Sequence, residues 1–394
     1  MLALRLARGA RATVLVRRLL VVLAAGGTGF LLLSALGFAM GHPHEHGTAA
    51  VRLAWCIVPV AATIDFAAAV ARSDPGTHPV PGVFAAGLGP VRLMAISTLT
   101  TVMMCLTGSV LALLLFLQLR GDLLAALPFH GAADGLLAAG RPLPVAALVL
   151  LLVLVPVAAS VTAALALRPR PGLGGVPRPD DAFDDLDQPP APTRRPSGLS
   201  WGIALFAAGL AVETSMSASA RHLAGLRLPR GLAGGSLGVL AGWALTAAGL
   251  AVAGPALTFA CGRLLQTTRP NGLRLLAGRI LQQEARRLGR PLGVVCAVAS
   301  GSYAAVTLLA GRGPGTGPMV AVGALLVAGC TVGTLLMAAV EARRERARTT
   351  AALLRLGAPA GALRTAVALR AGALLVLFAP LTWGVAAVAA VPLG

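Results

Sequence analysis

The sequence predicts an all-α, polytopic helical membrane protein. Of its 394 residues, 57% are hydrophobic and only 12% are charged, which is far more apolar than a soluble globular chain. Apolar runs of about 20 residues recur along the chain, the length that a helix needs to cross a bilayer core of about 30 Å. These runs lack the alternation of barrel strands, and lipid cannot hydrogen-bond the backbone, so helices are the structure that we expect.

Nine apolar runs predict about nine transmembrane helices. The first follows an Arg-rich N-terminus, but it is too long for the apolar region of a signal peptide and lacks a small-residue cleavage site, so we expect an uncleaved span. Residues 121–141 contain Asp122 and Asp134 and are expected to form an interfacial helix or turn. The predicted spans are 19–40, 53–71, 95–119, 143–167, 199–218, 236–262, 291–310, 319–340 and 371–394.

Arginine counts predict the orientation of these spans. With the N-terminus in the cytoplasm, the inner connections hold 26 of the 33 basic residues, all of which are Arg. Positive residues favour the cytoplasmic side, so we expect a multi-pass plasma membrane protein with an inner N-terminus.

A polar linker divides the chain into two halves. Residues 168–198 are rich in Pro, Asp and Arg and cannot bury enough apolar surface to fold alone, which predicts a flexible cytoplasmic segment. Residues 1–167 would form a first membrane unit of about four spans, 199–262 two connecting spans, and 263–394 a second unit. Each unit starts with an Arg-rich helix that runs into a span, which indicates a duplicated plan.

Composition excludes several functions. No Lys occurs, so the Gly-rich segment at 311–317 is not a Walker A loop, and the chain itself is not expected to be an enzyme. Its arginines lie between apolar runs and not on a soluble basic face, which argues against a nucleic-acid partner. The five cysteines are widely spaced within apolar runs and are expected to be small core residues. No cofactor is expected.

The cytoplasmic segment 341–370 is the most informative part of the chain. Four arginines and two glutamates open a helix, leucines surround a break at Gly357, and a second helix follows, which predicts an amphipathic elbow below the membrane. Such an elbow serves either as an anchor to anionic lipid or as a docking surface for a soluble protein.

The segment from Glu345 to Ala371 resembles the cytoplasmic signature of FtsX-like ABC transporter permeases, and the helix at 273–290 is similar to the elbow that precedes the family's first span. The plan resembles the actinobacterial type with two FtsX-like units, although large extracytoplasmic domains and a fourth span in the second unit are missing. The resemblance implies a permease subunit of the mechanotransmission type, partnered by the lipid bilayer and a cytoplasmic ABC ATPase dimer. The missing span implies either a divergent or degraded permease or one that a further membrane subunit completes. The residues that match the family's ATPase-coupling positions are Arg348, Arg355, Leu356, Gly357, Ala358 and Arg364, with Gly87 and Arg92 in the first half.

Two intramembrane carboxylates keep another class of function open. Asp65 lies in the second predicted span and Glu213 in the fifth, and such groups are either satisfied locally or functional. If both lined one cavity, the chain would be a secondary transporter, and a non-transporting membrane scaffold is a further alternative. His42, His44 and His46 in the first outer turn read as a polar turn or, less favourably, as ligands of Zn²⁺ or Cu²⁺; we assign no metal site.

Overall fold

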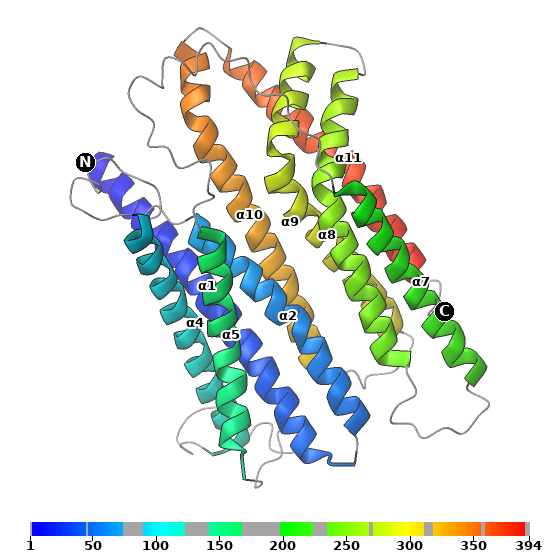
Figure 1. Ribbon diagram of the computed structural model, residues 1–394. Coiled ribbons are helices and arrows are strands. Elements are labelled where there is room, and N and C mark those ends of the chain that lie inside the picture. Colours follow the sequence, from blue (N-terminus) through cyan, green and yellow to red (C-terminus); the bar gives the residue numbers. More distant parts are fainter. Residues whose placement is uncertain are drawn as a thin grey trace.

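The computed structural model describes residues 2–44, 46–73, 90–122, 142–167, 198–223, 235–267, 271–310, 318–355 and 359–390. These residues form nine helices and no strand (Figure 1). The helices are α1 (Leu2–Gly41), α2 (His46–Arg72), α4 (Pro90–Arg120), α5 (Val145–Leu167), α7 (Leu199–Leu223), α8 (Gly235–Thr267), α9 (Gly272–Ala310), α10 (Pro318–Arg355) and α11 (Ala360–Ala390). Each predicted span falls on one of them, which confirms the all-α fold class.

Seven helices are long and apolar enough to cross a membrane, so the chain is a multi-pass membrane protein. The predicted spans 199–218 and 291–310 lie in α7 and α9, where the described residues give only a shorter apolar stretch, Leu199–Val212, and they stay predictions. The seven candidate spans are Val14–Gly41, Arg52–Arg72, Ala95–Arg120, Val145–Leu165, Ala241–Thr267, Ala321–Arg344 and Arg364–Ala387.

Three helices are much longer than their apolar parts. The Arg-rich segments before the first and seventh predicted spans are continuous with them in α1 and α9, and the segment after the eighth is continuous with α10. The helix at 273–290 is therefore no separate elbow in the membrane plane. Its Ala277, Leu281 and Ala285 are buried, each no more than 1% exposed, and the Thr258 hydroxyl of α8 donates a hydrogen bond of 3.1 Å to the Ala285 carbonyl.

The helices pack in two groups with α10 between them (Figure 1). In the first group, α1 contacts α2, α4 and α5. In the second, α8 lies between α7 and α9, and α9 also contacts α11. Helix α10 contacts α9 on one side and both α1 and α2 on the other. Helix α10 therefore joins the two groups. The order of the helices along the chain did not indicate this position.

Glycine allows close backbone contact inside each group. A Cβ at Gly108 of α4 would lie 2.6 Å from the Val22 carbonyl oxygen of α1, and one at Gly249 of α8 would lie 2.9 Å from the Gly202 carbonyl oxygen of α7. Gly254 of α8 faces Gly289 of α9 in the same way. Small residues let membrane helices approach until their backbones touch, and the resulting dispersion contacts stabilise each group.

Large side chains, in contrast, pack against the glycines where α10 meets the first group. Phe66 of α2 lies against Gly333 of α10, and Trp55 of α2 lies against Gly323. The Thr63 hydroxyl is 3.9 Å from the Cys330 sulfur. The contacts between the two helices advance in the same direction along both, from Thr63–Cys330 to Phe66–Gly333. Helices α2 and α10 are therefore parallel.

The five cysteines, Cys56, Cys105, Cys261, Cys296 and Cys330, are buried and free. This confirms the prediction that they are small core residues. Cys330 belongs to the largest buried cluster, together with Val21, Leu32 and Phe66 of the first group. The core of the first group thus extends onto α10.

Candidate functional site

Helix α10 continues well beyond its membrane-crossing part. The candidate span ends at Arg344, whereas the helix ends at Arg355. At 1.5 Å per residue, the eleven residues from Glu345 to Arg355 extend the helix by about 16 Å beyond the candidate span. Helix α11 starts at Ala360, four residues before its own candidate span. The first arm of the predicted elbow is thus a continuous extension of a span and not a separate surface helix.

Four arginines at the end of α10 and the start of α11 have exposed side chains. Arg343, Arg344 and Arg355 at the end of α10 and Arg364 at the start of α11 are exposed. Arg348 lies in the same stretch of α10, but its side chain is outside the described residues, as are Leu356, Gly357 and Ala358 between the two helices. Of the predicted coupling residues, the structure therefore places Arg355 and Arg364 on either side of the predicted break.

The counterpart in the first half is described only in part. Arg92 lies in the first turn of α4, with its side chain outside the described part of the chain, and Gly87 lies outside it altogether. What the structure does describe is the end of α2 that leads into this segment. Ser73, the residue after α2, is 3% exposed.

Ser73 joins three helices at this end of the molecule. The Arg17 guanidinium of α1 donates hydrogen bonds of 3.2 Å to the Ser73 carbonyl oxygen and 3.4 Å to its hydroxyl oxygen. The same hydroxyl lies 3.8 Å from the Met337 sulfur of α10. Arg17 is itself buried, 8% exposed, and a hydrogen bond from a buried cation is stronger than one between neutral groups. Sequence reasoning missed this junction, because Arg17 looked like one of several N-terminal charges.

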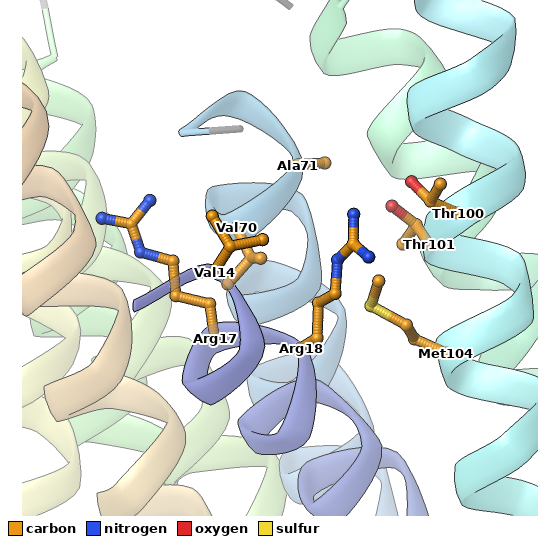
Figure 2. A pocket seen from close by; sticks show the side chains of 8 residues that line it. All are labelled: Val14, Arg17, Arg18, Val70, Ala71, Thr100, Thr101 and Met104. Atoms are coloured by element: carbon orange, nitrogen blue, oxygen red, sulfur yellow. The ribbon is translucent and has the colours of Figure 1, made fainter. Parts of the chain in front are cut away.

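A solvent-accessible cleft lies beside this junction, between α1, α2 and α4. The space in it that admits a water-sized molecule is about 30 Å³, and the rest of the cleft is open to solvent. Figure 2 shows Arg17 and Arg18 leaving α1 on opposite sides, with Arg18 directed toward Thr100 and Thr101 of α4. The remaining lining residues are Val14, Val70, Ala71 and Met104.

The two carboxylates that the sequence places in predicted spans lie on helices of different groups. Asp65 is on α2 at the protein surface, close enough to Arg72 of α2 and Arg290 of α9 for their charges to act on it. Glu213 is in α7, with its side chain outside the described residues. Helix α7 packs on α8, and nothing in the described residues brings Asp65 and Glu213 to one cavity.

The turn between α1 and α2 is built around an aromatic stack. The ring of His42 stacks on Phe38 with centroids 4.4 Å apart, and the Arg52 guanidinium lies 3.5 Å above the Phe38 ring. The side chain of His46 is outside the described residues. Among the described residues, no group of three His, Cys, Asp or Glu side chains could hold a metal ion.

The comparisons with known proteins give no relative. No protein-family model, no curated protein and no solved structure matches the chain. The candidate site is therefore argued from its own geometry.

Proposed function

We propose that this protein is the permease subunit of an ABC transporter of the FtsX-like, mechanotransmission type. It would lie in the plasma membrane with its N-terminus in the cytoplasm, and a separate cytoplasmic ATPase dimer would move it. The observation that carries the proposal is the extension of α10, which continues a membrane span as one helix up to the exposed Arg355.

The packing of α10 supports a transmitting role. A stiff helix transfers a displacement along its axis, and α10 contacts α1 and α2 of one group and α9 of the other. Movement of its extension would therefore act on both groups at once. Because the α2–α10 contact runs from Trp55–Gly323 to Ser73–Met337, it couples the two halves over most of the membrane thickness.

The contacts within the halves also support a duplicated plan. Each half contains an Arg-rich helix that contacts the next two long helices of the proposed unit. Helix α1 contacts α2 and α4, and helix α9 contacts α10 and α11 in the same way. Helices α2 and α10, which occupy the same place in the two sets, pack against each other. Such an arrangement is what two related units with a pseudo-two-fold relationship would form.

Site-specific photocrosslinking tests the proposal. A photoreactive amino acid at Arg355 or Arg364, in cells that naturally produce the chain, should capture a protein that carries a Walker A lysine and hydrolyses ATP. The control position is Arg52, an exposed arginine at the opposite end of the bundle. Arg355→Glu combined with Arg364→Glu should abolish co-purification of the captured ATPase, because charge reversal replaces attraction by repulsion. Capture of the same ATPase from Arg52, or none from Arg355 and Arg364, would refute the proposal.

The alternative of a secondary transporter gains no support from the described residues, because Asp65 and Glu213 lie on helices of separate groups. Asp65→Asn distinguishes the two functions. A secondary transporter would lose its response to a proton gradient, whereas the ATPase-driven permease would keep its stimulation of ATP hydrolysis.

A further inference from the structure

The cleft between α1, α2 and α4 combines positive charge with an opening to its surroundings. Of the eight lining residues that the structure describes, two are arginines and none is acidic. Arg17 is buried and bonded to Ser73, whereas Arg18 is exposed and, among the described residues, has no hydrogen-bond or ion-pair partner. Figure 2 shows the Arg18 guanidinium in the space between α1 and α4. An anion that enters this space would meet one available cation.

The cleft lies beside a close contact of the same helices. Gly26 of α1 and Gly108 of α4 allow the two backbones to touch. Arg18, about two turns before Gly26, and Met104, about one turn before Gly108, line the cleft instead.

The cleft lies near the same end of two candidate spans. The candidate spans of α1 and α4 start at Val14 and Ala95, so Arg18 lies about 6 Å and Thr100 about 7.5 Å inside the end of its span. A long cationic side chain at this depth reaches back toward the phosphate layer.

The side chains that follow the cleft toward the middle of the two spans are apolar and exposed. Leu19, next to Arg18, is 52% exposed, and Met103, one turn after Thr100, is 54% exposed. In a membrane-spanning helix these side chains contact acyl chains. A molecule held by Arg18 would therefore have an anionic group and an apolar body in contact with Leu19 and Met103, which is the chemistry of a phospholipid.

We propose that this cleft binds the headgroup phosphate of one anionic glycerophospholipid. Arg18 holds the phosphate, with the two nitrogen donors of its guanidinium fork matched to two phosphate oxygens. The hydroxyls of Thr100 and Thr101 already donate to the Ser97 carbonyl, at 2.8 and 3.0 Å, so Arg18 supplies the attraction and the threonines fill the opposite wall. This assignment is independent of the ATPase-coupled function.

Native mass spectrometry of the purified full chain tests it. Phosphatidylglycerol and phosphatidylcholine with identical acyl chains are added separately, and the dissociation constant of each adduct is measured. The native chain should prefer phosphatidylglycerol, and Arg18→Gln should weaken its binding about tenfold or more. The matched control is Arg344→Gln, which removes an exposed arginine at the end of another candidate span and should leave the preference unchanged.

A second variant keeps the test decisive if Arg18→Gln impairs membrane insertion. Met104→Trp fills the cleft without changing the charge, and it should also remove the preference for phosphatidylglycerol. Unchanged binding in both variants would overturn the proposal. So would displacement of phosphatidylglycerol by an equal concentration of inorganic phosphate, since the site would then hold a soluble anion and not a lipid.

Discussion

The indole rings of Trp55 on α2 and Trp243 on α8 lie 6.2 Å apart at an interplanar angle of 38°. This pair joins the two helix groups near the end that the arginine counts place outside the cell. Each ring lies against a glycine of another helix, Trp55 against Gly323 of α10 and Trp243 against Gly301 of α9. Residues from four helices thus meet at one level of the membrane.

The Trp55–Trp243 contact should contribute measurably to stability. We expect a double-mutant cycle of Trp55→Ala and Trp243→Ala to give a coupling free energy of about 0.5–1.5 kcal/mol, the usual value for an aromatic pair. Thermal or denaturant unfolding in detergent measures it. Additive losses in the two single variants would show that the rings do not interact.

The glycine contact between α1 and α4 predicts a position-specific effect of alanine. Gly108→Ala should destabilise the protein by about 1–3 kcal/mol, because the new Cβ would press on the Val22 carbonyl and on Ala25. Gly372→Ala, where no atom lies within 4 Å of the added Cβ, should be neutral or stabilising by about 0.5–1 kcal/mol. Unfolding midpoints compare them; equal effects would contradict the close approach of α1 and α4.

The α2–α10 contact predicts a disulfide across the two halves. Thr63→Cys places a second thiol beside Cys330, since the Thr63 hydroxyl is 3.9 Å from that sulfur. After mild oxidation, and cleavage at a protease site inserted in the linker, the two fragments should stay joined on a non-reducing gel and separate after reduction. Ile64→Cys, on the next face of α2, is the control. Equal cross-linking of both variants would argue against the packing described.

Cysteine labelling tests the orientation on which the proposed function depends. The five native cysteines are buried, so a membrane-impermeant maleimide should leave the native chain unlabelled. Arg355→Cys should react in inside-out vesicles and not in intact cells, and Arg52→Cys should show the reverse. Labelling of Arg355→Cys in intact cells would place the α10 extension outside and exclude a cytoplasmic ATPase as its partner.

Hydropathy alone was enough to place each helix, but not to find where the long ones end. The sequence predicted a span at 319–340, and α10 continues to Arg355. A hydropathy pattern indicates which solvent surrounds a helix and does not report whether the backbone stays helical after it leaves lipid. Arg, Glu and Ala are all good helix formers, so the polar segment continues the turn of the span.

Helix partners were harder to predict than helix positions. Glycines allow close packing, yet their spacing in α8 does not identify Gly289 of α9 as the residue that faces Gly254. The junction at Ser73 was missed for a similar reason, because its hydrogen bonds to Arg17 join residues 56 positions apart. The cleft beside Arg18 is lined by residues of α1, α2 and α4, and only the three-dimensional packing of these helices brings its walls together.

The position of α10 also bears on how the chain can be divided. The linker at 168–198 separates the halves in sequence, but α10 fills a surface of α1 and α2 that belongs to the other half. Two polypeptides split within this linker would therefore carry matching surfaces and should reassemble when they are produced in the same membrane. Natural gene fission at that point would leave a working heterodimer and not two independent proteins.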